Sequence, residues 1–145
     1  MLAALSAEQA DFLLVGAYAL AAHGLVRATG DIDIWVRPTL ENANKVWRAL
    51  CHFGAPLESM RLEDFADPNL IFKMGLPPTR IDILMSVSGV DFDEAWANRK
   101  EYDLEGLKIF VISARDQIIN KRASGRDKDV LDAIWLERHG DSQSD

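Results

Sequence analysis

The stretch from Phe12 to Val36 decides the fold, and it reads FLLVGAYALAAHGLVRATGDIDIWV. Its first four residues are apolar and end at Gly16, a pattern typical of a buried strand that enters a tight turn. The Ala- and Leu-rich residues that follow favour a helix from Ala17 to His23. After a short loop, strict alternation from Asp31 to Val36 predicts a second strand, with both aspartates and Trp35 on one face. The stretch therefore predicts a strand, a turn, a helix and a strand in succession.

The rest of the chain predicts an α/β (α+β) fold, with a small mixed sheet flanked by helices and a C-terminal helical segment. Spacing, alternation and capping residues predict a helix over 39–54, a helical turn over 61–66, a hairpin of strands over 69–74 and 80–85, a short helix over 91–98, a second hairpin over 101–112, and helices over 113–123 and 127–138. We interpret residues 1–138 as a single domain and residues 139–145 as a polar, flexible tail. In the last helix we expect an apolar stripe, with charged residues on or near the other face; the stripe is Val130, Leu131, Ile134 and Trp135, and the charged residues are Lys128, Asp129 and Asp132.

The composition limits the classes of partner. With 145 residues, 48% hydrophobic and 27% charged, the chain is long and apolar enough for one domain with one core. Its net charge of −7 weighs against non-specific binding of nucleic acid, whose phosphates attract clustered Lys and Arg. The longest apolar run, around 12–25, is too polar and too short for a membrane span, and the N-terminus lacks the early positive charge of a secretory segment. We therefore expect a cytoplasmic protein with no membrane partner.

Three aspartates are the first candidates for chemistry. Asp31 and Asp33 stand two residues apart on one strand face, roughly 6.5 to 7 Å from each other along the backbone. Two such carboxylates raise each other's pKa unless a positive partner is present, and Mg²⁺, which takes oxygen ligands, is a natural one. Asp82 offers a third carboxylate on the polar face of a later strand. The alternative is that all three are surface residues and that Asp82 pairs with Arg80.

The turn at Gly16 is the second candidate. A glycine between a buried strand and a helix leaves backbone N–H groups and the positive end of the helix dipole available to an anion. A turn that simply needs a small residue gives the same pattern. The order of residues along the chain favours the anion interpretation, because Arg27 and Thr29 follow in the loop, then the aspartate pair, and then Asp82.

A resemblance to the nucleotidyltransferase superfamily of the DNA polymerase beta type is carried by the run VGAYALAAHGLVRATGDIDIWV, together with RIDIL at residues 80–84. The chain looks most like the small bacterial nucleotidyltransferases related to AbiEii-type toxins, whose motif begins with Gly-Gly or Gly-Ser and continues to an Asp-hydrophobic-Asp pair. The C-terminal residues ISARDQIINKRASGRDKDVLDAIWLE are also similar to that group. The resemblance spans Phe12 to Glu137 and implies a single nucleotidyltransferase-like domain.

The resemblance implies roles for individual residues. Asp31 and Asp33 match the metal-binding pair, and Asp82 matches the third carboxylate, which helps to hold the catalytic metal and to deprotonate the acceptor hydroxyl. The positions implied in nucleotide binding are Gly16 and Ala17 in the turn, Arg27 and Thr29 in the loop, Lys121 near the triphosphate, and Asp129 in the C-terminal motif. In the loop, a structural hydrogen bond is an equal alternative to a phosphate contact.

The implied function is the Mg²⁺-dependent transfer of a nucleoside monophosphate from a nucleoside triphosphate to a hydroxyl-type acceptor, with two metal ions. Relatives act on small molecules, tRNA or proteins, and the acidic charge favours a small molecule or a protein here over nucleic acid. The alternative is a catalytically silent, nucleotidyltransferase-like binding module, such as a toxin–antitoxin component. It is motivated by Ala17, which stands where the family usually has Gly or Ser and which lacks a hydroxyl. A homodimer is compatible with the short chain, which offers limited surface for enclosing two substrates.

Other residues give weaker indications. The histidines show no metal-ligand spacing with the single cysteine, and Ser86 and Ser88 have no evident partners for a hydrolase triad. The tryptophans are interpreted as core or interface anchors, although Trp35 shares the face of the aspartate pair, where it would border a base or acceptor pocket. The basic residues from Lys121 to Lys128 form either a phosphate clamp or a solvated helix junction.

Overall fold

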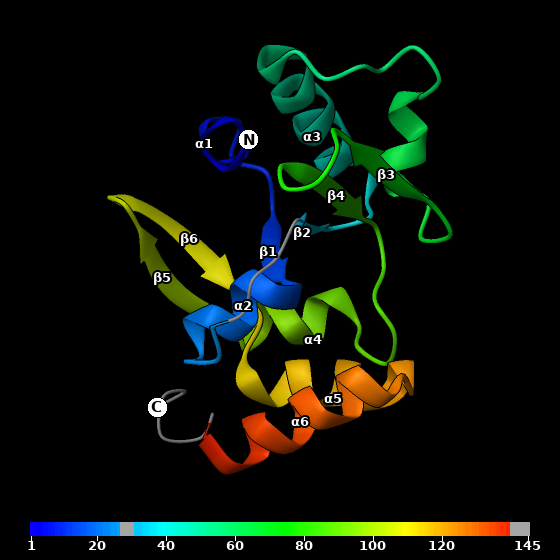
Figure 1. Ribbon diagram of the computed structural model, residues 1–145. Helices are drawn as coiled ribbons and strands as arrows, with labels where there is room; N and C mark the ends of the chain where they lie inside the picture. The colour runs from blue at the N-terminus through cyan, green and yellow to red at the C-terminus, as the bar shows by residue number, and fades with distance from the viewer. Residues whose placement is uncertain (27–30, 140–145) are drawn as a thin grey trace.

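The computed structural model describes residues 1–26 and 31–139. It contains a six-stranded mixed sheet with the strand order β3-β4-β2-β1-β6-β5, flanked by helices (Figure 1). The elements are α1 (Leu2–Ala7), β1 (Phe12–Val15), α2 (Gly16–Ala22), β2 (Asp31–Val36), α3 (Leu40–Phe53), the 3-10 helix η1 (Leu62–Ala66), β3 (Ile71–Met74), β4 (Arg80–Leu84), α4 (Phe92–Ala97), β5 (Lys100–Leu104), β6 (Leu107–Val111), α5 (Ala114–Ser124) and α6 (Asp127–His139). The predicted fold class is confirmed. None of the helices in these ranges is long and apolar enough to cross a membrane.

β2 is the strand around which the sheet is built. It pairs antiparallel with β1 on one side and parallel with β4 on the other. Both predicted hairpins are present, β3 with β4 and β5 with β6, and β6 joins the sheet through a parallel contact with β1. Because β1 and β2 are antiparallel, the end of β1 and the start of β2 meet at the same end of the sheet. The turn at Gly16 therefore lies beside the aspartate pair.

The two faces of the sheet carry different helices. Figure 1 shows α1 and α3 on one side of the sheet and α2, α4, α5 and α6 on the other. Ile34 and its register partner Ile83 are fully buried on one face. Trp35 points to the opposite face, where its ring makes an edge contact with Phe92 of α4 at 5.0 Å between centroids. The aspartates of β2 share this second face with Trp35.

The prediction for the last helix is partly wrong. Leu131, which was expected in its apolar stripe, is 64% exposed, whereas Asp129 and Asp132 are almost completely buried. The buried side of α6 faces α5, where Lys121 pairs with both carboxylates, so an ion cluster replaces part of the expected apolar contact. The helix also extends one residue into the predicted tail, and residues 140–145 lie outside the described residues.

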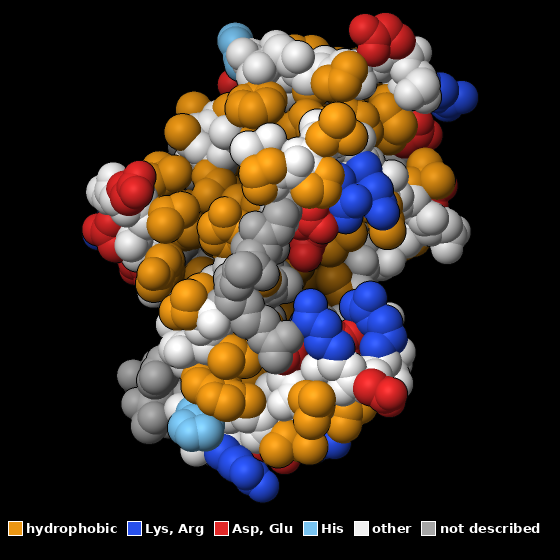
Figure 2. All heavy atoms as spheres, viewed as in Figure 1, with side chains coloured by type: hydrophobic (Ala, Val, Ile, Leu, Met, Phe, Trp, Pro, Cys, Tyr) orange, Lys and Arg blue, Asp and Glu red, His pale blue; other side chains and the backbone are white. Residues whose placement is uncertain are grey.

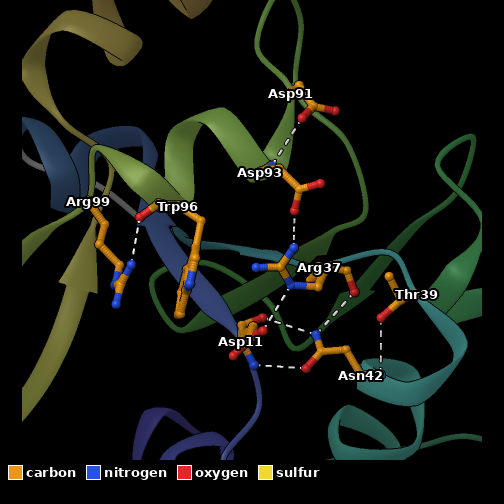
Figure 3. Close-up of polar contacts among 8 residues, drawn as sticks. All are labelled: Asp11, Arg37, Thr39, Asn42, Asp91, Asp93, Trp96 and Arg99. Carbon is orange, nitrogen blue, oxygen red and sulfur yellow. Dashed lines mark hydrogen bonds and ion pairs between the residues drawn. The ribbon is translucent and has the colours of Figure 1, made fainter.

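A buried amide fixes the start of α3 to the sheet. The Oδ1 atom of Asn42 accepts from the Asp11 N–H at 2.8 Å, and its Nδ2 donates to the carbonyl oxygens of Asp11 and Arg37 at 3.0 Å each (Figure 3). Thr39 caps the same helix, because its Oγ1 accepts from the Asn42 N–H at 3.2 Å. These bonds satisfy backbone groups immediately before β1 and after β2.

We predict that Asn42→Ala lowers the free energy of unfolding by about 2–4 kcal/mol, because it leaves buried backbone groups beside β1 and β2 with fewer partners. Urea unfolding followed by circular dichroism measures the change. The matched control is Asn44→Ala, since Asn44 donates to the Leu40 carbonyl of its own helical turn, and a loss of about 0.5 kcal/mol or less is expected. Equal losses in the two variants would contradict the role assigned to Asn42.

Candidate functional site

A cleft of about 280 Å³ opens between the start of β2 and the helices α5 and α6. Its walls are formed by Gly16, Ala17, Leu20, Asp31, Asp33, Lys121, Arg126, Lys128, Asp129 and Asp132. Figure 2 shows a hollow on this face of the molecule, with Lys and Arg side chains on both of its sides. Every described residue of the predicted site except Asp82 lines this cleft. Arg27 and Thr29 lie outside the described residues.

The three predicted metal ligands lie on two adjacent strands. Asp33 in β2 is the direct register partner of Asp82 in β4, and Asp31 is the partner of Arg80. Because these residues are in register on neighbouring strands, their side chains share one face of the sheet. Asp82 is only 6% exposed, so its interpretation as a surface residue is wrong.

Arg80 bridges two of the three carboxylates. Its Nη2 donates to Asp31 Oδ2 at 2.7 Å and to Asp82 Oδ2 at 3.2 Å, and its Nε lies 3.1 Å from Asp82 Oδ1. The predicted pairing of Asp82 with Arg80 is therefore confirmed, although it lies within the site and not on the surface. One positive charge beside several carboxylates leaves this edge of the sheet with an excess of negative charge.

The pKa of Asp33 is higher than that of an ordinary aspartate. Burial, followed by the nearby charges of Asp82 and Asp31, raises the pKa of Asp33 to about 6, against the opposing effects of Lys121 and Arg80. The ionised form of Asp33 is thus disfavoured unless a further positive charge is present. A cation added at this edge of the sheet would favour the ionised form of Asp33.

The chemistry of the donor set fits a hard divalent cation. Carboxylate oxygens are ligands that Mg²⁺ takes in proteins, and an added cation would relieve the repulsion at Asp33. In the described part of the chain, no three carboxylate, imidazole or thiol groups already stand close enough to form a metal site. The guanidinium of Arg80 is bonded to both Asp31 and Asp82. A cation bound by the same carboxylate oxygens would compete with Arg80 for them.

Gly16 contacts Asp33 so closely that a side chain would not fit. Its φ of +67° is left-handed, and a Cβ atom added to it would lie 2.3 Å from Asp33 Oδ2. Gln117, which is buried in α5, donates from Nε2 to the Gly16 carbonyl oxygen at 3.0 Å. Gln117 is not among the predicted site residues, although its place one helical turn before Lys121 puts both on the same side of α5.

Lys121 belongs to an ion cluster at the junction of α5 and α6. Its Nζ lies 3.2 Å from Asp129 Oδ1 and 3.6 Å from Asp132 Oδ2. Asp129 also accepts from Ser124 Oγ at 2.6 Å and from Arg126 Nε at 2.7 Å. Burial alone would raise the pKa of Asp129, but these hydrogen bonds and the charge of Lys121 together hold it below its ordinary value. Asp129 is therefore ionised and holds two cationic side chains at the wall of the cleft.

The basic side chains at the junction of α5 and α6 differ in their exposure to solvent. The Lys121 side chain is 11% exposed, whereas the Arg126 side chain is 78% exposed and Lys128 also lies at the exposed rim. A nearly buried cation with exposed cations beside it suits a polyanion, because some contacts are pre-organised and others remain free to adapt. Asp132 is not predicted as a site residue, because helical spacing alone places it near the outer face of α6.

The chain matches the model of a protein family over residues 2–137, and this family is described as nucleotidyltransferases of unknown function (DUF6036). The chain belongs to this family. The matched range includes every residue that lines the cleft, and it supports both the predicted nucleotidyltransferase superfamily and a nucleotidyltransferase activity. No curated protein matches the chain.

We predict that Gly16→Ala lowers the free energy of unfolding by about 3–5 kcal/mol, because the methyl group adds a clash with Asp33 to left-handed backbone strain. The matched control is Gly54→Ala, where φ is +86° but nothing lies within 4 Å of the added Cβ. That control carries backbone strain alone, so we expect a loss of about 1–2 kcal/mol in the same urea titration. A loss in Gly16→Ala no larger than in the control would show that the Asp33 contact is loose.

We predict that Asp33→Asn stabilises the metal-free protein at neutral and higher pH. Because the folded-state pKa of about 6 exceeds the ordinary value of 3.8, the native state keeps its proton longer than the unfolded chain and loses stability as the pH rises between these values. The variant lacks this loss, so after allowance for solvent screening it should gain about 1–2 kcal/mol over the parent at about pH 8 and little at about pH 4.

Urea unfolding in EDTA at both pH values measures this difference. Glu58→Gln, which removes a carboxylate at an exposed position outside the cleft, is the control and should show no comparable gain. A gain in Asp33→Asn that is independent of pH would contradict the assigned origin of the Asp33 pKa.

Proposed function

We propose that this protein is a Mg²⁺-dependent enzyme that transfers a nucleoside monophosphate from a nucleoside triphosphate to a hydroxyl-type acceptor. The observation that carries the proposal is the cleft, in which an edge rich in carboxylates faces a basic wall. The carboxylates suit a divalent cation and the basic wall suits a triphosphate. Membership of the family supports the class of reaction and leaves the substrates open.

Asp31, Asp33 and Asp82 would hold the metal, with two ions in the proposed reaction. Bound Mg²⁺ supplies positive charge that lowers the pKa of the acceptor hydroxyl and stabilises the leaving pyrophosphate. The strand register, which sets Asp33 directly beside Asp82, supports this assignment.

Lys121, Arg126 and Lys128 would bind the phosphates of the nucleotide. Lys121 is the best placed of them, since it is nearly buried and is held in position by Asp129. The backbone of Gly16 and Ala17 borders the same cleft, and alanine keeps the N–H donor that a phosphate contact in the turn would use. The missing hydroxyl at Ala17 therefore removes one contact without removing the turn.

We also propose to which group of nucleotidyltransferases the chain is related. A relationship to the DNA polymerase beta type, and within it to the AbiEii-type group, is supported by the order of Gly16, Asp31, Asp33 and Asp82 around one edge of the sheet. A small molecule or a protein is favoured over nucleic acid as the acceptor, because a net charge of −7 opposes the approach of a large polyanion.

A catalytically silent module that binds nucleotide or a partner protein, such as a toxin–antitoxin component, is the second candidate. Two observations favour it. Ala17 lacks the hydroxyl of a serine at this position, and Arg80 is bonded between two of the proposed metal ligands. Such a module would bind nucleotide in a calorimetric titration with Mg²⁺ and release no pyrophosphate over a long incubation.

We predict that Asp33→Asn abolishes transfer and slows pyrophosphate release at least about 100-fold, because a neutral amide cannot replace the charge of a carboxylate ligand. The parent protein, incubated with labelled ATP, CTP, GTP or UTP in a cell extract, should label an acceptor that mass spectrometry identifies. Glu58→Gln, outside the cleft, should label it as the parent does. Transfer by Asp33→Asn at the parental rate would reject the assignment.

A further inference from the structure

A second hollow, of about 230 Å³, lies at the other end of β2 and is lined by Trp35, Arg37, Met85, Asp91 and Phe92, among others. We propose that this hollow is the acceptor pocket. The acceptor it fits is a compact, neutral or cationic molecule with an apolar ring-sized part, a hydrogen-bond acceptor atom and a free hydroxyl. The inference rests on the nucleotidyl transfer proposed above and names the substrate class of the same reaction.

The two strands that carry the carboxylates lead from the cleft to this hollow. Trp35 follows Asp33 by two residues on β2, so the two side chains share a face and lie roughly 7 Å apart along the strand. Met85 follows the end of β4, three residues after Asp82, and also lines the hollow. For transfer, the hydroxyl of a molecule seated against Trp35 would have to reach Asp33 along this face of the strand.

Trp35 lines the hollow, and its indole carries a buried hydrogen-bond donor. Trp35 is 1% exposed, and its ring packs edge-on against Phe92. Among the residues that the structure describes, none accepts a hydrogen bond from its Nε1. A buried N–H without an acceptor costs about 1–3 kcal/mol, which a carbonyl, an ether oxygen or a ring nitrogen of a bound molecule would recover.

The charge around the hollow favours a neutral or cationic molecule. Arg37 pairs with both Asp11 and Asp93 (Figure 3). Its guanidinium lies 4.7 Å from the centroid of the Phe92 ring. Its positive charge is thus already balanced. Asp91 accepts from the Asp93 N–H at the start of α4 and adds a further negative charge at the hollow. Three carboxylates around one arginine disfavour phosphate groups here, in contrast to the basic wall of the cleft.

The reaction brings two substrates of different charge together. The acceptor hydroxyl oxygen forms a bond to the α-phosphorus of the triphosphate, while the bond from that phosphorus to the bridging oxygen breaks and pyrophosphate leaves with the electron pair. The hydroxyl proton passes to a carboxylate of the cleft. The anionic substrate therefore belongs with the cations of α5 and α6, and the uncharged or cationic substrate belongs beside α4.

The test uses 3-(hydroxymethyl)pyridine, a neutral probe with a ring nitrogen and a hydroxyl. In the full-length ¹⁵N-labelled protein, the Trp35 indole N–H signal, identified by its loss in Trp35→Phe, should shift and saturate with a dissociation constant on the order of 1 mM. Benzyl alcohol lacks the ring nitrogen and should bind at least about threefold more weakly. Nicotinate carries a carboxylate and should also bind at least about threefold more weakly, because Asp91 repels it.

Two variants separate this site from the catalytic cleft. Asp91→Asn keeps a residue that caps helices well, and it should improve nicotinate binding about threefold while leaving 3-(hydroxymethyl)pyridine binding unchanged. Arg126→Ala, which changes an exposed side chain in the wall of the cleft, should leave the binding of both probes unchanged. In the extract assay, saturating 3-(hydroxymethyl)pyridine should lower the labelling of the natural acceptor about tenfold.

An indole signal that does not shift, or that shifts equally with all three probes, would overturn the inference. Labelling that persists unchanged at saturating probe would also overturn it, since the hollow would then not hold the acceptor. A saturable shift in a parent protein that never releases pyrophosphate would instead reject the proposed transfer and the acceptor role, while retaining the hollow as a small-molecule binding site.

Discussion

The contact between Gly16 and Asp33 is the constraint on which the candidate site depends. Antiparallel pairing of β1 with β2 brings the end of one strand beside the start of the other, and only a residue without a side chain leaves space for the Asp33 carboxylate. The register on the other side of β2 sets Asp82 beside Asp33. One strand thus positions the turn and two carboxylates at once, and a shift by one residue would turn these side chains to the opposite face.

The carboxylates of the candidate site repel one another, and the fold keeps them close in spite of this repulsion. Burial and two neighbouring carboxylates raise the pKa of Asp33, and Arg80 and Lys121 offset this only in part. The buried apolar residues on both sides of the sheet supply the stability that holds the carboxylates close to one another. Repulsion that remains unrelieved within a fold is more typical of a binding site than of a structural ion pair, because a bound cation can complete it.

The face of the sheet that carries the aspartates is divided by charge. Helices α5 and α6 border the cleft with cations that Asp129 holds in place, whereas α4 borders the second hollow with carboxylates around Arg37. Asp33 and Trp35 lie on the same strand face between these regions. In the proposed reaction, the nucleotide belongs with the cations of α5 and α6, and a neutral or cationic acceptor belongs with the carboxylates around Arg37.

The sequence by itself determined the local elements and most of the candidate residues. Strand alternation, the Thr39 cap and both hairpins depend on residues that are close in the chain, and charged residues in apolar strands are recognisable without a structure. Only the tertiary structure decided that Arg80 lies between two aspartates, that Gln117 bonds to Gly16, and that Asp132 turns inward. These features depend on which distant segments pack together, and the periodicity of a single helix or strand carries no information about its neighbours.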